Sequence, residues 1–408
     1  MKPEPNPMIL RNCRYLITQN AKRDIFEHMD IEIQDNTIKR IGKNIATKSS
    51  DNSGVIDCSE RIVMPGLVNT HTHLGMHSLR GICDDAELHD WLSIVTKAED
   101  SLSEDDVHDN TVDGLVEALR FGTTTIYDSF KYPRARARAF EKMGARGLIS
   151  ASVYNKKDLK AAEQFISTIR SPLLRPAIAA HSIYKTEESV LRGVIAVSED
   201  KKILRRIHVG ETRKERFDIQ QQTEKLPIEY LESIGFLDPK ALLVHCIWIT
   251  KGEIGLIGHA GAKVSHNPIS NMKLASGGVM PLVEMLHENV IVGLGTDSVA
   301  SNNNLDLFEE IKLTPLLHKQ HRWDPKVITP QQALDMATVN GAACLGLPDV
   351  GSIEAGKKAD IVTLDIGKHM KPINNLLSNI VYCANGNDVN DVIIDGKVVM
   401  RNKELQKS

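Results

Sequence analysis

Residues 62–77, IVMPGLVNTHTHLGMH, place a short apolar run directly before a cluster of histidines. Apolar and β-branched residues on both sides of Pro65-Gly66 predict strands. His71 and His73 stand two positions apart, so in a strand both imidazoles project from the same face. Imidazole is the commonest metal-binding side chain in proteins. The stretch therefore predicts a fold in which a strand end carries a candidate metal site.

Seven further apolar runs follow, separated by amphipathic stretches of helical period. In chain order they read GTTTIYDSF, RGLISASVY, RPAIAAHSIY, KKILRRIHVGET, ALLVHCIW, AKVSHNP and VIVGLGTDS. Eight buried strands with helical crossovers are typical of an eightfold parallel barrel, although an open doubly wound sheet gives a related pattern. The open sheet lacks the support of a G-x-G-x-x-G fingerprint in this sequence. We predict an α/β fold, a (β/α)8 TIM-type barrel over residues 64–348.

Both ends of the chain differ from this middle part. They consist of short β-branched runs broken by turn signals, and IIDGKVVM reads as a hairpin around Asp395-Gly396. Strand-rich segments on both sides of a barrel indicate that the two ends form one unit. We predict a small β-sandwich domain built from residues 1–63 and 349–408.

The composition excludes several classes of function. The chain has 408 residues, 41% of them hydrophobic, and a net charge of −3, so we expect no nucleic-acid partner. We expect the arginines of PRARARAF (134, 136 and 138) to lie on a solvated surface. The six cysteines form no C-x-x-C pair, and no apolar run is long enough to span a membrane. We therefore expect a cytoplasmic protein without a membrane partner.

Polar residues end most of the predicted barrel strands. After the histidine pair of the first strand come His181, His208 followed by Glu211, His245, His266 and Asp297. In a barrel these ends meet at one rim, so their side chains share one site; we expect His266 to form part of its wall.

A metal site follows from these ends. His71, His73, His208 and Asp297 suit zinc or ferrous iron with one position left for water. The fourth run contains no lysine that could supply a bridging ligand, so we predict a single divalent ion.

The motifs MPGLVNTHTHLGMHSLRGICDD, IHVGET, VHCIWIT, VSHNPISNMKLASGG and GLGTDSVASNNNLDLFEE resemble the amidohydrolase superfamily. Within it they look most like the branch of methylthioadenosine and S-adenosylhomocysteine deaminases. The resemblance implies that His71, His73, His208 and Asp297 bind one metal ion, Zn²⁺ first and Fe²⁺ second. It implies that Glu211 moves a proton to the substrate ring, that His245 orients the attacking water and that Asp297 accepts a proton from it.

The same resemblance implies substrate contacts from Trp91, Glu99 and His181, with Glu99 on the ribose hydroxyls and Glu211 and Asp297 at the reacting ring. A family arginine aligns with Ala151, which weakens the case for a carboxylate-bearing tail; Arg146 or Lys156 are possible substitutes. His77 is expected to lie outside the site.

We predict a metal-dependent hydrolytic deaminase of an adenine nucleoside: methylthioadenosine, S-adenosylhomocysteine, adenosine or 5′-deoxyadenosine. The alternative keeps the metal and changes the ring to a free base (cytosine or guanine) or an s-triazine. A barrel that has lost catalysis is a third hypothesis, but Glu211 and all four metal-ligand candidates are present. The substrate is a small molecule, and the family resemblance implies a homo-oligomer.

Overall fold

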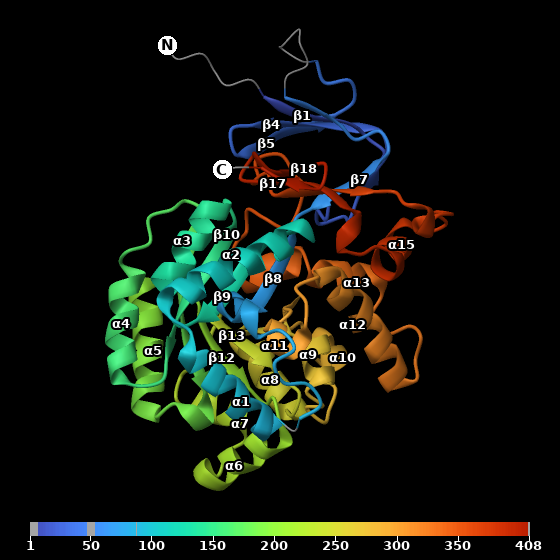
Figure 1. Cartoon of the computed structure of the whole chain (residues 1–408). Coiled ribbons are helices and arrows are strands. Elements are labelled where there is room, and N and C mark those ends of the chain that lie inside the picture. Colours follow the sequence, from blue (N-terminus) through green and yellow to red (C-terminus); the bar gives the residue numbers. More distant parts are fainter. Residues whose placement is uncertain (1–6, 47–53, 87, 407–408) are drawn as a thin grey trace.

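The computed structural model describes residues 7–46, 54–86 and 88–406. Figure 1 shows a barrel surrounded by helices, with sheets stacked on one end of it. Strands from the beginning of the chain (blue) and from its end (red) lie together in these sheets.

An eight-stranded parallel sheet forms the barrel, with neighbours in strict chain order. The prediction of a TIM-type barrel is confirmed. Each of the seven later runs forms one strand, and the first run divides at Gly66, so that only its part from Leu67 on belongs to the barrel. The strands are β8 (Leu67–Thr72), β9 (Thr123–Phe130), β10 (Arg146–Val153), β11 (Leu174–Ser182), β12 (Arg205–Val209), β13 (Ala241–His245), β14 (Lys263–His266) and β15 (Val292–Leu294). Most of their residues are buried, as expected where a core fills one face and helices cover the other.

The barrel closes between β8 and β15. The hydroxyl of Thr70 donates to the carbonyl oxygen of Leu294 at 2.8 Å. Beyond the end of β15, the N–H of Asp297 donates to the carbonyl oxygen of His71 at 2.9 Å. The seam therefore brings the first and the last strand ends together at the rim.

Helices follow most strands and cover the barrel. They are α1 (Leu88–Ser101), α2 (Glu104–Arg120), α3 (Pro133–Met143), α4 (Lys156–Ile166), α5 (Glu188–Lys201), α6 (Arg213–Thr223), α7 (Pro227–Ser233), α8 (Lys251–Ala260), α9 (Pro268–Lys273), α10 (Leu282–His287), α11 (Val299–Asn302), α12 (Leu307–Arg322), α13 (Pro330–Met336), α14 (Val339–Cys344) and α15 (Leu376–Cys383). Short 3-10 helices are η1 (Leu74–Leu79), η2 (Ile183–Lys185), η3 (Lys368–Met370) and η4 (Gly386–Asp388).

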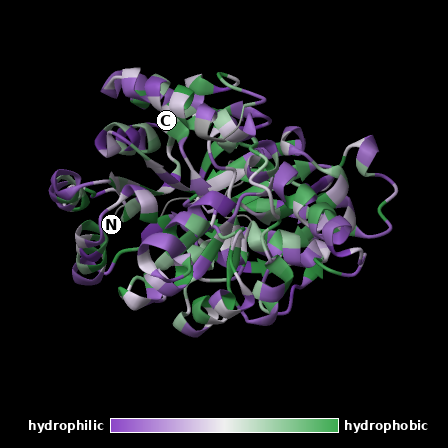
Figure 2. Ribbon diagram, turned by 90° about the horizontal axis from the view of Figure 1, so that it is seen from below, coloured by the Kyte–Doolittle hydropathy of each residue, from purple (hydrophilic) through white to green (hydrophobic). Residues whose placement is uncertain are grey.

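Local sequence signals account for where several helices begin. Ser103 and Asp106 form a capping box at the start of α2, and Thr250 and Glu253 form another at α8. Viewed from below, the peripheral helices alternate hydrophilic and hydrophobic segments, as amphipathic helices do (Figure 2). In the described part of the chain, no helix combines the length and the apolar character needed to cross a membrane.

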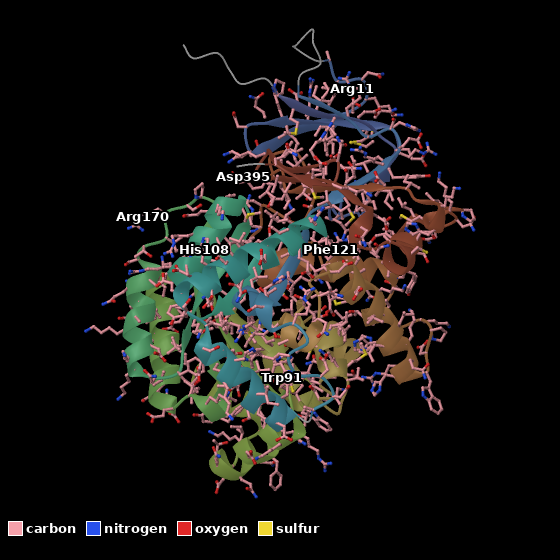
Figure 3. All side chains as sticks on the ribbon, viewed as in Figure 1. Arg11, Trp91, His108, Phe121, Arg170 and Asp395 are labelled. Carbon is pink, nitrogen blue, oxygen red and sulfur yellow. The ribbon has the colours of Figure 1, made fainter. Side chains whose placement is uncertain are left out.

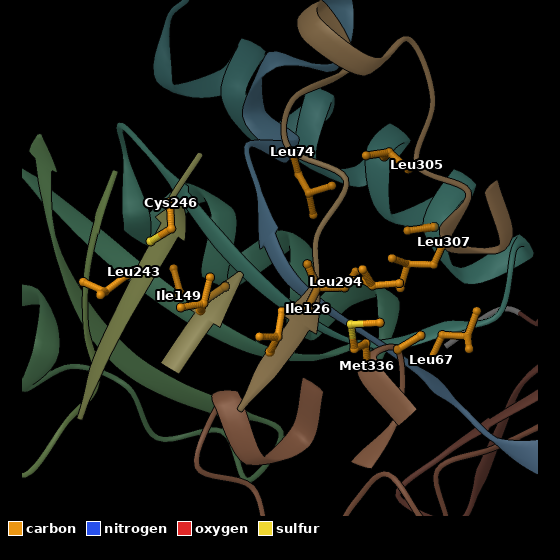
Figure 4. Packing of buried hydrophobic residues seen from close by; sticks show 14 of the residues in the cluster. Leu67, Leu74, Ile126, Ile149, Leu243, Cys246, Leu294, Leu305, Leu307 and Met336 are labelled. Atoms are coloured by element: carbon orange, nitrogen blue, oxygen red, sulfur yellow. The ribbon is translucent and has the colours of Figure 1, made fainter. Parts of the chain in front are cut away.

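The main core lies between the strands and their helices. Figure 4 shows Ile149 of β10, Leu243 of β13, Cys246 just after β13 and Leu294 of β15, which belong to one hydrophobic cluster. Cys246 is fully buried there, one position after His245, so successive residues face opposite sides of the barrel wall. Every described cysteine is a free thiol.

The ends of the chain build the remaining two sheets, and only the seven-stranded one combines strands from both ends. A four-stranded sheet has the order β5-β4-β1-β6, and a seven-stranded sheet has the order β19-β18-β17-β16-β7-β2-β3. Their strands are β1 (Met8–Cys13), β2 (Tyr15–Ile17), β3 (Ile25–Phe26), β4 (Met29–Gln34), β5 (Thr37–Gly42), β6 (Val55–Asp57), β7 (Arg61–Pro65), β16 (Ile361–Asp365), β17 (Val389–Ile394), β18 (Lys397–Arg401) and β19 (Glu404–Leu405).

The pairing of β7 with β16 joins the two ends of the chain. Ile62 lies opposite Leu364 in this antiparallel pair. The predicted hairpin forms between β17 and β18, with Ile394 opposite Lys397 across the Asp395-Gly396 turn. Pro65 still belongs to β7 and Leu67 begins β8. The division of the chain at 63/64 and 348/349 stays a prediction.

Arg136 departs from the expected surface position. It is buried in α3, and its guanidinium donates to the carboxylate of Asp128 at 2.6 Å. The helix turns this side chain toward β9, whose carbonyl groups from Asp128 and Phe130 accept further hydrogen bonds. Its role is therefore to tie α3 to the barrel wall.

Candidate active site

The end of β8 places two imidazoles next to one carboxylate. His71 is fully buried and His73 partly buried. Their Nε2 atoms lie 3.2 and 3.4 Å from Oδ1 of Asp297, which follows β15. The barrel seam thus joins the first and eighth strands at one cluster of donor atoms.

His208 completes this cluster from β12. Its ring centroid is 5.1 Å from that of His71 and 5.8 Å from that of His73. Ligand atoms of His71, His73 and His208 all lie within 4.8 Å of one another, and the same holds for His71, His245 and Asp297. Three imidazoles and one carboxylate therefore surround a volume of atomic size.

Neighbouring groups orient these side chains. Nδ1 of His73 donates to the carbonyl oxygen of Ser129, and Nδ1 of His208 donates to that of His181 at 2.8 Å. The proton of each neutral ring is then on Nδ1, which leaves the Nε2 lone pair free. The hydroxyl of Ser270 donates to Oδ2 of Asp297 at 2.8 Å and fixes that carboxylate.

His245 and Glu211 face each other beside the cluster. Nε2 of His245 lies 3.8 Å from Oε2 of Glu211. The backbone of His245 is left-handed, with φ of 76°, and that of Asp297 has φ of 62°. Such conformations are strained for residues with a side chain and occur often at functional sites. The carboxylate of Glu215 accepts the backbone N–H of Glu211 at 2.9 Å and holds this segment in place.

Burial shifts the protonation of the whole cluster. It lowers the pKa of His71 and His208 well below the ordinary value, and the positive charge of Arg206 acts in the same direction. Burial raises the pKa of Asp297, but attraction to His71 and His73 outweighs it and the pKa lies well below the usual range. The cluster therefore holds neutral imidazoles around an ionised carboxylate at neutral pH.

The pKa of Glu211 is shifted upward, opposite to that of Asp297. Burial raises its pKa, the charge of His245 lowers it and the charge of Asp297 raises it further, with a net increase. A carboxyl group with a raised pKa keeps its proton to a higher pH than an ordinary one and is suited to donate that proton and recover it. Glu211 can thus act as an acid and as a base.

A cavity of about 420 Å³ opens next to these residues. Trp91, Glu99 and His181 line it together with His73, His208, Glu211, His245 and Asp297. Trp91 and Glu99 come from α1, which lies at the end of the barrel away from the terminal sheets (Figure 3). His71 lies buried behind them, adjoining His73 and Asp297. The predicted metal-binding, catalytic and substrate-contacting residues therefore meet at one place.

Ala151 does not face this cavity. It belongs to the apolar cluster between β10 and the helices, and the neighbouring Ser152 lines the cavity instead. Arg146 lies at the opposite end of β10, where it pairs with Asp360 at 2.6 Å and Asp395 at 3.0 Å. Lys156 is absent from the cavity lining. An alanine at 151 therefore says nothing about the substrate.

Two other histidines lie elsewhere. The expectation that His266 forms a cavity wall is wrong: its Nε2 lies 3.2 Å from Nε2 of His318 on α12. His77 lies outside the cavity, as expected, with its Nε2 3.0 Å from a carboxylate oxygen of Glu117 on α2.

Several residues of the cavity lining are not among those predicted from the sequence: Lys131, Tyr154, Tyr184, Lys185 and Arg206. Arg206 stands two positions before His208 in β12, so strand alternation alone could have pointed to it. The others lie in loops or at helix starts after the strands, and no local pattern marks them. Lys131 and Lys185 lie near Glu99, where burial raises the carboxyl pKa to about 7 and both cations lower it.

Known proteins resemble this chain over most of its length. A model of the amidohydrolase family matches residues 62–399. A 5′-deoxyadenosine deaminase of Methanosphaera stadtmanae is 38% identical over 394 residues, covering 94% of this chain and 92% of that protein. A 5-methylthioadenosine/S-adenosylhomocysteine deaminase of Thermococcus onnurineus is 40% identical over 388 residues, covering 92% of this chain and 90% of that protein.

Solved structures agree. An adenosine deaminase of Xanthomonas campestris with bound zinc superposes with a TM-score of 0.94 at 29% identity, covering 100% of this chain and 95% of that one. The zinc complex of an atrazine chlorohydrolase of Arthrobacter aurescens has a TM-score of 0.91 at 22% identity and covers 98% of this chain and 97% of that one. This similarity shows the shared fold. On the family match and these relatives, the chain belongs to the amidohydrolase family.

Proposed function

We propose that this chain is a metal-dependent hydrolytic deaminase that releases ammonia from an adenine nucleoside. The observation that carries the proposal is the convergence of His71, His73, His208 and Asp297 on one cavity that also holds Glu211 and Glu99. The relatives named as deaminases of 5′-deoxyadenosine and of methylthioadenosine and S-adenosylhomocysteine support the same substrate class.

The donor set suits one divalent ion, Zn²⁺ first and Fe²⁺ second. His73 and His208 offer Nε2 lone pairs, because their Nδ1 atoms donate to carbonyl groups. The carboxylate of Asp297 faces the Nε2 atoms of His71 and His73. Imidazole and carboxylate ligands with one position left for water are typical of catalytic zinc sites. The bound cation supplies Lewis acidity, which brings the pKa of water toward about 7.

The protein's own groups carry the protons in this proposal. Asp297 accepts a proton from the attacking water, and His245 orients that water toward the ring carbon bearing the amino group. Glu211, with its raised pKa, donates a proton to the adjacent ring nitrogen, which gives a tetrahedral carbon. The proton held by Asp297 then passes to the amino group, which leaves as ammonia, and the remaining hydroxyl proton returns to Glu211 as the ring carbonyl forms. Burial in the barrel mouth strengthens each of these electrostatic contacts.

The cavity favours a nucleoside over a free base. Glu99 provides a carboxylate that can accept hydrogen bonds from two ribose hydroxyls, and Trp91 and His181 supply ring surfaces in the same cavity. A cytosine, guanine or s-triazine ring has no group that needs this carboxylate. Lys185 lines the same part of the cavity and offers a positive charge to a substrate tail that ends in a carboxylate.

We also propose a cytoplasmic location, because all the described cysteines are free thiols, the form that a reducing compartment preserves. The homo-oligomer implied by the family resemblance stays a prediction, and light scattering of the purified protein measures it directly.

Ammonia release from the zinc-loaded protein tests the proposed function. The substrates are adenosine, 5′-deoxyadenosine, methylthioadenosine, S-adenosylhomocysteine, guanine, cytosine and an aminotriazine. We expect turnover of the nucleosides and none of the free bases. Turnover of only a free base or the triazine would overturn the nucleoside proposal while leaving the hydrolytic metal chemistry in place.

A further inference from the structure

Arg206 is a buried arginine without a carboxylate partner. It is 1% exposed, and its Nε has no hydrogen-bond partner. Arg136, Arg146 and Arg205, the other buried arginines in the described part of the chain, donate to Asp128, Asp360 and Asp238 at 2.6, 2.6 and 2.9 Å. Burying an unpaired cation costs free energy of folding, so a buried arginine without an acidic partner indicates a functional role.

The position of Arg206 connects it to the proposed metal ligands. It lies in β12 on the same face as His208, and it lines the cavity. Its Nη2 lies 3.1 Å from Nδ1 of His71, and its Nη1 lies 3.2 Å from Nδ1 of His208. The guanidinium therefore lies directly behind two of the rings that face the metal position.

Hydrogen bonding does not explain the contact with His208. Nδ1 of His208 already donates to the carbonyl oxygen of His181 at 2.8 Å, so it cannot also accept an N–H from Arg206. Two donors thus approach each other at this contact. The carboxylate of Asp297, whose Oδ1 lies 3.2 Å from Nε2 of His71, and that of Glu211 line the same cavity as the guanidinium.

We propose that Arg206 is a fixed positive charge that compensates these carboxylates in the metal-free protein and thereby weakens the binding of the divalent cation. The inference rests on the metal site of the proposed function. A cation that enters among His71, His73 and Asp297 meets the guanidinium just behind the rings, in a dry environment where like charges repel far more strongly than in water. Removing the charge relieves this repulsion and leaves the carboxylates to the metal alone.

Zinc affinity, measured by competition with a chromophoric chelator, tests this role without any assay of activity. We expect Arg206→Met to bind zinc at least about tenfold more tightly than the natural chain. We expect Arg206→Lys, which keeps the charge, to stay within about threefold. The thermal unfolding temperature of metal-free Arg206→Met should fall, because Asp297 and Glu211 lose their compensating cation.

Arg205→Met is the matched control. Arg205 precedes Arg206 in β12 but faces away from the cavity, where it pairs with Asp238 and the carbonyl oxygen of Phe236. This variant should lose stability and keep the natural zinc affinity. Arg206→Gln, also neutral, provides the same comparison if the methionine variant does not fold.

Equal or weaker zinc binding by a folded neutral variant overturns the proposal. So does an Arg206→Lys variant that binds as tightly as Arg206→Met, since geometry and not charge would then control affinity. The proposed deaminase fails by a different result, namely a protein that binds zinc without releasing ammonia from any nucleoside. His73→Ala, which should abolish zinc binding, verifies that the measured site is this one.

Discussion

The backbone N–H of Asp297 donates to the carbonyl oxygen of His71 at 2.9 Å, and the side chains of the same two residues meet at 3.2 Å. The hydrogen bond that closes the barrel seam therefore also sets the separation of a proposed metal-binding carboxylate and imidazole. Because the backbone fixes this distance, the site is assembled by folding and does not depend on the metal to bring the first and last strands together.

Replacing Asp297 with asparagine should empty the metal site. The amide removes the negative charge from the donor set, and we expect the zinc content to fall from about one per chain to less than about a tenth, with at least about a hundredfold loss of affinity. Elemental analysis of the dialysed protein measures this. His77→Ala, at a histidine of η1 that pairs with Glu117, should keep its zinc. A fully metallated Asp297→Asn protein contradicts the ligand assignment.

Glu211→Gln should separate metal binding from catalysis. The amide cannot transfer a proton, so we expect kcat for the nucleoside to fall by about 10²- to 10⁴-fold while the zinc content stays the same. Stopped-assay ammonia measurement and elemental analysis on one preparation give both values. Glu224→Gln, at an exposed position just after α6, serves as the control. An active Glu211→Gln enzyme rules out the proton-transfer role.

Glu99 should make nucleoside binding depend on pH. Burial raises its pKa to about 7, so the carboxylate that accepts ribose hydroxyls forms only as the pH rises through that value. KM for the nucleoside should therefore fall between pH 6 and 8. Glu99→Gln should raise KM by about tenfold or more and flatten its pH profile, since hydrogen bonds to a charged acceptor are the stronger ones.

The ionisation of Glu99 that improves nucleoside binding at higher pH lowers the stability of the folded protein. The pKa of Glu99 is raised on folding, so its contribution is fully present below the unfolded value near 4.5 and is lost as the pH rises through about 7. Urea unfolding at both ends of this window, compared with Glu99→Gln, measures it. Asp90→Asn, at an exposed position of α1, is the control for both experiments. A pH-independent KM in the natural enzyme refutes the ribose contact.

Arg146 should matter for stability and not for substrate. Its pairing with Asp360 is buried at the junction of the barrel and the terminal sheets. Arg146→Met leaves that carboxylate uncompensated, and we expect a loss of about 3–5 kcal/mol in the free energy of unfolding. The double variant with Asp360→Leu should recover much of it. Urea titration gives the stability, and an altered KM in the folded single variant would place Arg146 in the substrate site after all.

Sequence alone predicted the barrel and the cluster at its rim. The eight apolar runs with intervening helices specified the strands, because a strand buried on both faces needs a short continuous apolar segment. Since all strands of a parallel barrel point the same way, residues that end them, such as His208 and Asp297, must meet. Trp91 and Glu99 carry no such signal; they came from the family resemblance, and the path of α1 brings them to the cavity.

Tertiary structure alone decided on which side of the wall a residue lies and which charge compensates which. Ala151 and Ser152 are neighbours in sequence, yet one packs against helices and the other lines the cavity, because strand register determines the facing. Sequence could not show that Arg206 lacks an acid while Arg205 has one. The carboxylates that compensate a buried cation come from distant segments, so their distances exist only after the strands have closed into a barrel.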